Sequence, residues 1–329
     1  MDSASLVVPD AGPLSTAPSS FFGRKTTAAQ IVSGQDLTGK NILVTGGNSG
    51  VGLETARACA EAGATVIMGC RSLVRGQAAA ADISATTGKT VQVRELDVSK
   101  LESVRAFADQ YIASGAHLHV LVNNAGIGNY GGTSGAATTT VEGWDMIFAT
   151  NYIGPFLLTH LLMPVMRRSA PARVVNVSSI AGEGKFPFEI ADMPYTTEGQ
   201  VFERYSQSKF AQTLHAAELQ KRESANGVSA FSLHPGVIKT AIWNNAGNPC
   251  LVGCISCLFA MCSCFRTTKS IEAGAATQTV CAVTAGIEAQ GGAFFDDCVA
   301  RPHKRSAEAQ EKQVALFEAT NRWLGLENS

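Results

Sequence analysis

The stretch YSQSK, residues 205–209, places a tyrosine and a lysine four residues apart. At this spacing two side chains lie on the same face of a helix. A tyrosine phenol has an ordinary pKa of about 10, so it needs help to exchange a proton near neutral pH. A cation one helical turn away favours the phenolate and lowers that pKa. Tyr205 and Lys209 therefore predict general acid–base chemistry, although a lone Y-x-x-x-K match also arises by chance.

A second set of residues is suited to holding phosphate. TGGNSGVG (45–52) lies between the apolar run NILVT (41–45) and a segment with helical spacing. Glycines allow a sharp turn and a close approach of pyrophosphate to the backbone, and a helix start supplies free N–H groups. This position favours a dinucleotide site over an ordinary glycine-rich turn. The predicted contacts are Gly46, Asn48, Ser49, Gly50, Val51 and Gly52.

The end of the next apolar run distinguishes between two dinucleotides. It reads GCRS (69–72) and has Arg71 where an acidic residue would bind the 2′-hydroxyl of NAD. Because an arginine accommodates the 2′-phosphate of NADP, Arg71 favours NADP(H). The alternative is that Arg71 is only a solvated residue at a helix start.

Two further segments are expected at the same edge of the predicted sheet. Asp97, followed by Val98, comes after the third strand and is placed to hydrogen-bond an adenine. NNAG (123–126) comes after the fourth strand. The carboxyl ends of parallel strands meet where a ligand binds. The predicted contacts there are Asp97, Val98, Asn124, Ala125 and Gly126.

Strands and helices must alternate to position these residues. Apolar strand-like runs are predicted at 41–45, 64–70, 91–97, 118–126, 173–179 and 228–236. Helical patterns lie at 51–63, 71–88, 99–115, 144–169, 205–224 and 270–286, with an amphipathic one at 304–326. Ser99 and Glu102 have the spacing of a capping box. This order predicts a single Rossmann-type, doubly wound α/β domain with a parallel sheet of about seven strands.

Composition limits the class of protein further. The chain has 329 residues, of which 45% are hydrophobic and 16% charged, and its net charge is −1. A core is therefore expected, and nucleic-acid binding is not. Residues 1–35 are predicted to be a flexible tail and 36–329 the domain. No signal-peptide pattern precedes it, so we expect a cytoplasmic location, with an organelle or peripheral membrane association left open.

Taken together, TGGNSGVG, NNAG, NVSS, YSQSK and HPGVIKT resemble the short-chain dehydrogenase/reductase family over about residues 36–299. The resemblance implies that Tyr205 is the catalytic acid/base and that Lys209 lowers its pKa and holds the nicotinamide ribose. It also implies that Ser179 binds the substrate oxygen, that Asn151 anchors a relay water, and that the loop after the sixth strand lines the nicotinamide. The residues of that loop are Pro235, Gly236, Val237 and Thr240.

The long insert between Ser179 and Tyr205 is similar to that of the retinol-dehydrogenase-like and WW-domain-oxidoreductase-like branch. This resemblance implies an NADP(H)-dependent oxidoreductase acting on a lipophilic aldehyde, ketone or alcohol. Two alternatives stay open, an NADP(H)-binding sensor or scaffold and a protochlorophyllide-reductase-like enzyme. The oligomeric state, monomer or homodimer, is also left open.

Five of the nine cysteines lie in CLVGCISCLFAMCSCF (250–265). The apolar residues between them disfavour a structural zinc site, and no metal is expected. The segment falls within 241–270, where the family places its substrate lid. We expect an apolar lid, a peripheral membrane contact, or both.

Overall fold

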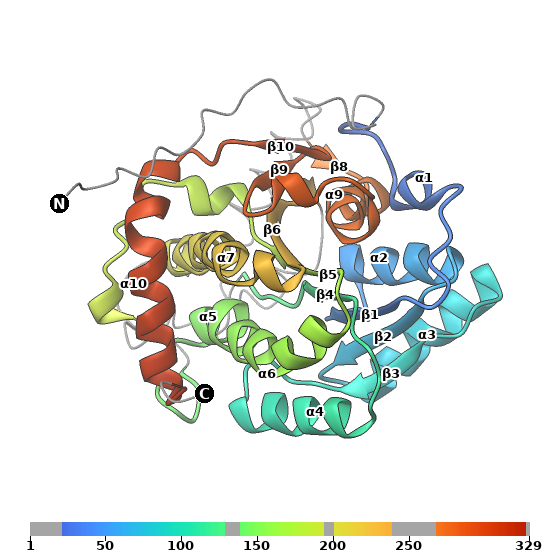
Figure 1. The fold of residues 1–329 in the computed structure, drawn as a ribbon, viewed down its shortest axis with the longest axis horizontal. Coiled ribbons are helices and arrows are strands. Elements are labelled where there is room, and N and C mark those ends of the chain that lie inside the picture. The colour runs from blue at the N-terminus through green and yellow to red at the C-terminus, as the bar shows by residue number, and fades with distance from the viewer. Residues whose placement is uncertain (1–21, 129–138, 194–200, 239–267, 327–329) are drawn as a thin grey trace, which may run out of the picture.

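The computed structural model describes residues 22–128, 139–193, 201–238 and 268–326. In this part of the chain, an eight-stranded sheet has the order β10-β9-β6-β5-β4-β1-β2-β3 (Figure 1). The strands are β1 (Asn41–Thr45), β2 (Thr65–Cys70), β3 (Gln92–Glu95), β4 (Val120–Asn123), β5 (Ala172–Val177), β6 (Val228–His234), β9 (Phe294–Asp296) and β10 (Val299–Arg301). All neighbours pair in parallel except β10, which runs antiparallel to β9. The predicted parallel sheet is confirmed, with an antiparallel strand added at one edge.

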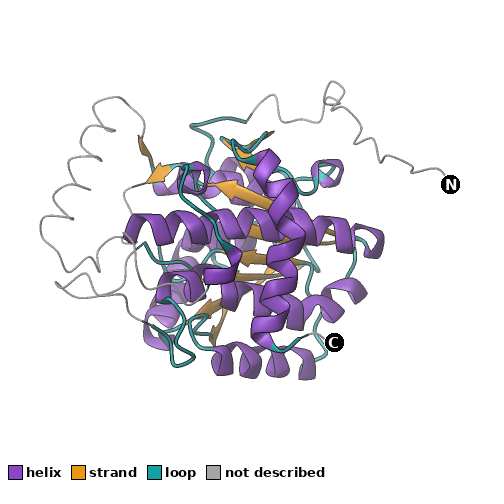
Figure 2. Ribbon diagram, turned by 90° about the vertical axis from the view of Figure 1, so that its left-hand side faces the viewer, coloured by secondary structure: helices purple, strands orange, loops and turns teal. Residues whose placement is uncertain are grey.

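Helices cover both faces of this sheet (Figure 1), and Figure 2 shows helices of one face lying in front of the strands. One face carries α4 (Leu101–Ala113), α6 (Gly154–Arg168) and α7 (Val201–Glu223); the other carries α2 (Gly50–Glu61), α3 (Leu73–Thr87) and α9 (Ile271–Val283). Successive residues of a strand point to opposite faces, so Leu43 packs into the first core while Ile42 and Val44 pack into the second. Because both faces are buried, the central strands β1, β4 and β5 are mostly apolar, whereas the edge strand β3 (QVRE) is polar and partly exposed.

The predicted long helix at 144–169 contains a change of helix type. It begins with α5 (Met146–Phe148), continues as a π-helical segment (Ala149–Ile153) and ends as α6. Within the described residues, Met146–Arg168 is long and apolar enough to cross a membrane, with a mean hydropathy of 1.3. However, 83% of its most apolar window is buried inside the domain, so it is the core helix of this fold.

The predicted start of α4 needs a correction. Lys100, and not Ser99, precedes the first helical residue, and no side chain caps the helix. The Ser99 hydroxyl instead donates a hydrogen bond of 2.6 Å to Oδ1 of Asp97. The Ser99 hydroxyl is therefore bonded to the Asp97 carboxylate and is not used to cap the helix.

The boundary of the predicted N-terminal tail also needs a correction. Residues 1–21 lie outside the described part, but α1 (Ala28–Val32) is a helix closed by a capping box between Thr27 and Gln30. Its buried residues Ala28 and Val32 pack with Ala58 of α2 and Ala275 of α9. The domain therefore begins before residue 36.

The C-terminal amphipathic segment forms α10 (Ser306–Leu324), which lies beside α7 (Figure 1). Its buried face includes Leu316, Thr320 and Leu324, and the Thr320 hydroxyl is 2.8 Å from that of Tyr152. The apolar face of this helix is therefore used to pack on its own domain.

Two short strands, β7 (Val237–Ile238) and β8 (Thr268–Lys269), pair in parallel beyond the end of β6. The cysteine-rich segment 250–265 and most of the predicted lid lie outside the described residues. The four cysteines that the structure does describe, Cys59, Cys70, Cys281 and Cys298, are buried and unpaired.

Candidate active site

The glycine loop turns sharply between β1 and α2 and presses against the turn after β4. Gly46 has φ +66°, and a Cβ there would lie 3.1 Å from Cα of Ala125. A Cβ on Gly52 would lie 2.4 Å from Nδ2 of Asn124 and 2.8 Å from the carbonyl oxygen of Gly46. Only glycine fits this position without displacing the loop.

Thr45 and Asn124 join the loop to the turn after β4. The amide of Asn124 donates 2.8 Å to the carbonyl of Thr45, and the Thr45 hydroxyl accepts from the backbone N–H groups of Asn124 (3.0 Å) and Ala125 (2.9 Å). Thr45 was not among the predicted site residues. A hydroxyl at the last position of a buried strand was the available signal.

The start of α2 is open to an anion. Ser49 precedes the helix in an extended conformation and makes no side-chain capping bond. The first backbone N–H groups of the helix, from Gly50, Val51 and Gly52, have no intrahelical acceptor. Together with Asn48, they form the backbone cradle that a pyrophosphate requires. The N–H of Gly46 donates to the carbonyl of Gly69 (2.8 Å), so Gly46 shapes the turn and does not offer a free donor. The residues present therefore fit a dinucleotide.

The two residues predicted to contact the adenosine part of the dinucleotide, Arg71 and Asp97, lie at the ends of adjacent strands. Arg71 follows β2 and is exposed, while Asp97 follows β3 and is half-buried. Oδ1 of Asp97 accepts from the backbone N–H of Ser99 (3.1 Å), which fixes the carboxylate, and Val98 beside it is buried. Arg75, one turn into α3, adds a second exposed cation near Arg71 that the sequence reasoning did not include.

Tyr205 and Lys209 lie one turn apart on α7, as predicted, and both are buried. Nζ of Lys209 is 5.7 Å from the centroid of the Tyr205 ring and donates a 2.8 Å hydrogen bond to the carbonyl of Val177 at the end of β5. A Cβ on Gly126 would approach Nζ of Lys209 to 3.3 Å. The turn after β4 therefore lies against the Lys209 amine on α7.

Burial changes the proton affinity of both groups. It raises the pKa of Tyr205 to about 12, against the opposing effect of a hydrogen bond with Ser179. It lowers the pKa of Lys209 to about 8. We expected the lysine to lower the tyrosine pKa; here burial dominates, and Tyr205 is a neutral phenol at pH 7.

The two serines after β5 have different surroundings. Ser178 is fully buried, and its hydroxyl donates 2.5 Å to the backbone carbonyl of Lys209. Ser179 is half-exposed; its hydroxyl is bonded to Tyr205 and caps the 3-10 helix Ile180–Glu183 by accepting from the N–H of Ala181 at 3.1 Å. The prediction chose the serine that faces the phenol.

Asn151 lies in the π-helical segment and is completely buried. Its amide accepts from the N–H of Ile127 (2.8 Å) and donates to the carbonyl of Ile127 (2.9 Å) and the hydroxyl of Ser208 (2.9 Å). Gln212 donates to its backbone carbonyl. The extra residue of the π-turn brings this amide to the chain after NNAG.

The loop after β6 is described as far as Ile238. His234 is buried, which lowers its pKa to about 4, and it is followed by Pro235 and Gly236 at the sheet edge. Gly236 has φ +103°, and a Cβ there would lie 2.5 Å from the Lys269 side chain. Val237 begins β7, and Thr240 lies outside the described residues.

The insert after Ser179 brings aromatic side chains near the phenol. The ring centroid of Phe202 is 6.4 Å from that of Tyr205 and 5.8 Å from that of Phe186. Phe202 remains 48% exposed, and Ile180 is exposed as well. The approach to the phenol is therefore partly apolar.

The structure combines a doubly wound sheet, a glycine cradle at the end of β1, and the group Ser179, Tyr205 and Lys209. This is the arrangement of a dehydrogenase. Residues 40–250 match the short chain dehydrogenase family, and the chain belongs to that family, as the sequence motifs predicted. It is 38% identical over 323 residues to retinol dehydrogenase 12 from Mus musculus, covering 95% of this chain and 94% of that protein.

Two solved structures extend the comparison. A putative uncharacterized protein from Mycobacterium paratuberculosis is 29% identical, with a TM-score of 0.68 over 92% of this chain and 98% of that one. A Pseudomonas aeruginosa RhlG/NADP active-site complex is also 29% identical, with a TM-score of 0.52 over 65% of this chain and 79% of that one. The class of the protein is thus a short-chain oxidoreductase similar to the retinol dehydrogenases.

Proposed function

We propose that this protein interconverts an apolar aldehyde or ketone and its alcohol with NADP(H). The observation that carries this proposal is the grouping of Ser179, Tyr205 and Lys209, with the Tyr205 phenol bonded to Ser179 and the Lys209 amine one turn away. When bound, a reduced nicotinamide supplies the hydride that a carbonyl carbon accepts. The protein must orient the carbonyl and deliver a proton to its oxygen.

Tyr205 is suited to act as that proton donor. Its raised pKa keeps the phenol protonated at neutral pH. A carbonyl oxygen placed between the hydroxyls of Ser179 and Tyr205 would accept a hydrogen bond from each, and the phenol proton would move to it as negative charge develops. Lys209 then stabilises the phenolate that remains.

In the direction of alcohol oxidation the same groups act in reverse. The phenol must first lose its proton, which its pKa of about 12 opposes, so oxidation should accelerate as pH rises. A Cβ on Gly126 would lie 3.1 Å from Oδ1 of Asn151 and 3.3 Å from Nζ of Lys209, so both groups border Gly126. We propose that Asn151, whose amide is fixed by Ile127 and Ser208, helps to anchor a water that links Lys209 to solvent.

Two observations support the cofactor and the substrate class. Arg71 is exposed at the end of β2, the position where a cation binds a 2′-phosphate, and the RhlG relative is a complex with NADP. The exposed side chains of Phe202, beside the Tyr205 ring, and of Ile180, the residue after Ser179, favour a substrate with an apolar body.

The test is a screen of aldehydes and ketones of graded size and polarity, monitored by NADPH oxidation. We expect turnover to be greatest for apolar substrates and NADPH to be preferred to NADH. Absence of turnover on the whole panel, despite tight NADPH binding, would contradict the proposal and favour a cofactor-binding sensor.

A further inference from the structure

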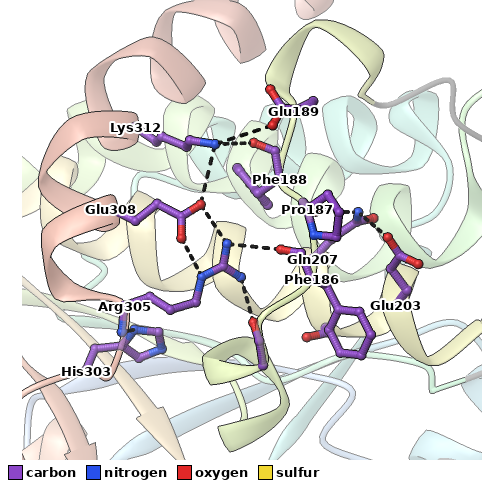
Figure 3. A network of polar contacts seen from close by, with 12 residues as sticks. Phe186, Pro187, Phe188, Glu189, Glu203, Gln207, His303, Arg305, Glu308 and Lys312 are labelled. Atoms are coloured by element: carbon purple, nitrogen blue, oxygen red, sulfur yellow. Dashed lines mark hydrogen bonds and ion pairs between the residues drawn. The ribbon is translucent and has the colours of Figure 1, made fainter.

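An irregular segment, Gly184–Glu189, follows the 3-10 helix that Ser179 begins. Its backbone carbonyls accept hydrogen bonds from cations of the C-terminal region (Figure 3). Nη1 of Arg305 donates to Gly184 (3.0 Å) and Nη2 to Phe186 (3.3 Å), while Nζ of Lys312 donates to Phe188 (2.6 Å). A segment without regular structure is thus held by side chains more than a hundred residues away in sequence.

Arg305 is itself rigidly held. Its guanidinium donates to both carboxylate oxygens of Glu308, at 2.7 Å each (Figure 3). Its Cζ lies 3.9 Å from the ring centroid of Phe210, the residue after Lys209. The Arg305 side chain is only 8% exposed. Such a planar, paired and stacked guanidinium has one orientation, which a lysine could not reproduce.

Glu183 forms a second attachment of the same region. Its buried carboxylate accepts from Nη1 (2.7 Å) and Nη2 (3.1 Å) of Arg301 and from the N–H of Lys304 (2.9 Å). Burial alone would raise the pKa of Glu183, but the hydrogen bonds from Arg301 and Lys304 outweigh it and lower the pKa. The end of the 3-10 helix is therefore fixed to residues 301–304.

The attached segment is in direct contact with the catalytic helix. A Cβ on Gly182 would lie 2.9 Å from the backbone nitrogen of Phe210. The Ser206 hydroxyl donates to the carbonyl of Ala181, and Gln207 donates to that of Pro187 at 2.8 Å. Any shift of residues 180–188 would therefore move Ser179 and Phe186 relative to Tyr205.

We propose that Arg305 is a positioning residue for the active site, and that it sets the selectivity for the body of the substrate. It acts by fixing the segment between Ser179 and Phe188, without touching substrate or cofactor itself. This inference rests on the proposed oxidoreductase function.

The experiment compares R305A with the matched variant R222A in the full-length protein. Arg222 also pairs with a glutamate one turn away, Glu218 at 2.8 Å, and its Cζ lies 4.3 Å from the ring of Phe317. Both variants lose an ion pair with a nearby glutamate and a cation–π contact that joins α7 to the α10 region. Only R305A also releases the insert.

We expect R305A to raise KM about tenfold or more for the largest apolar substrate of the panel, and less for a small aldehyde. NADPH affinity should stay within about twofold of the wild type, and R305K should recover only part of the loss. A KM ratio between large and small substrates that is unchanged in R305A, or equally changed in R222A, would overturn the proposal.

A second measurement does not depend on turnover. Lys185 is exposed, and the bond after it precedes Phe186, whose carbonyl Arg305 holds. Tryptic cleavage after Lys185, followed by mass spectrometry, should accelerate in R305A and not in R222A. If cleavage is unchanged in R305A, the positioning role is refuted, whether or not the protein has activity. If cleavage accelerates in R305A but the wild-type protein turns over no substrate, only the oxidoreductase function is refuted.

Discussion

The two sides of this active site are held in place by different kinds of contact. On the cofactor side, residues 41–126, close-packed backbone and short side chains such as Thr45 fix the glycine loop against the turn after β4. On the substrate side, residues 172–238 and 268–326, long charged side chains hold an irregular segment by its carbonyls. The glycine loop packs closely because glycine has no side chain, whereas the irregular segment is held by side chains long enough to bond its carbonyls.

This difference between the cofactor side and the substrate side has a functional explanation. A dinucleotide presents the same pyrophosphate to every member of a cofactor-binding family, so a cradle of glycines and N–H groups suffices. The body of a substrate differs from enzyme to enzyme, and a wall built on distant side chains can be repositioned without disturbing the cradle. Four changes test how separate the two sides are.

The largest effect is expected from removing the proton donor. Y205F should lower turnover roughly a hundred- to ten-thousandfold, because the carbonyl oxygen loses its acid. NADPH affinity, measured by fluorescence titration, should change little. Y111F is the matched control, since that buried hydroxyl bonds the carbonyl of His117 in the cofactor side (2.8 Å); equal losses in the two variants would contradict the assignment.

A smaller effect, confined to the cofactor side, is expected from G52A. The added methyl group would collide with Nδ2 of Asn124 and the carbonyl of Gly46, whose positions Thr45 and the loop fix. We expect NADPH affinity to fall about tenfold to a hundredfold, with turnover at saturating cofactor much less affected. G23A, where a methyl group meets nothing within 4 Å, should leave both values unchanged. A loss of turnover in G52A at saturating NADPH would show that the two sides are coupled.

Reversing the charge at Arg71 should change the cofactor preference without preventing binding. R71D removes the cation and introduces repulsion with a 2′-phosphate, so NADPH affinity should fall about tenfold while NADH affinity stays nearly constant. Lys89 is exposed beyond the opposite end of α3, and K89D makes the same charge change there. Equal weakening of both cofactors by R71D, or the same selective loss in K89D, would refute the role given to Arg71.

The smallest effect concerns stability on the substrate side. Burial lowers the pKa of His215 to about 3 and that of His303 to about 4, below the ordinary value of 6.5. The unfolded chain therefore binds protons that the folded protein does not, and stability is lost as pH falls below about 6.5.

Urea unfolding measures this loss directly. Between about pH 7.5 and pH 5.5, His215 should account for about 1 kcal/mol of the decrease in the free energy of unfolding. H215Q keeps a polar group beside Asn176 but cannot titrate, so its decrease should be smaller by that amount. Parallel slopes for H215Q and the wild type would show that His215 does not contribute.

The cofactor side could be predicted from the sequence because its signals are local. The loop 45–52, Arg71 and Asp97 each lie at or within two residues of the end of a strand, and strand ends meet at one edge of a parallel sheet. The Tyr205–Lys209 pair was predictable for the same reason, since four residues on a helix define one face. Where a local signal failed, at Ser99, a neighbouring carboxylate offered the hydroxyl another partner.

The substrate side could not be predicted in this way. The contact between Arg305 and Gly184 joins residues 121 positions apart, and neither the charge nor the glycine reveals its partner. The π-turn at Asn151 lies within a continuous apolar pattern that predicts only a helix. The raised pKa of Tyr205 comes from burial in the folded domain, so the spacing to Lys209 alone gave the opposite direction.

The attachment of the insert by its main chain has a consequence for protein engineering and for divergence within the family. Arg305 and Lys312 bind carbonyl oxygens, which every amino acid possesses. Residues 185 and 186 can therefore be exchanged without removing a partner from either cation. We expect a library randomised at these two positions to retain a wild-type melting temperature in most members while its substrate range varies widely. Evolution could have used the same freedom, by substituting the residues that face the substrate on a backbone that stays in place.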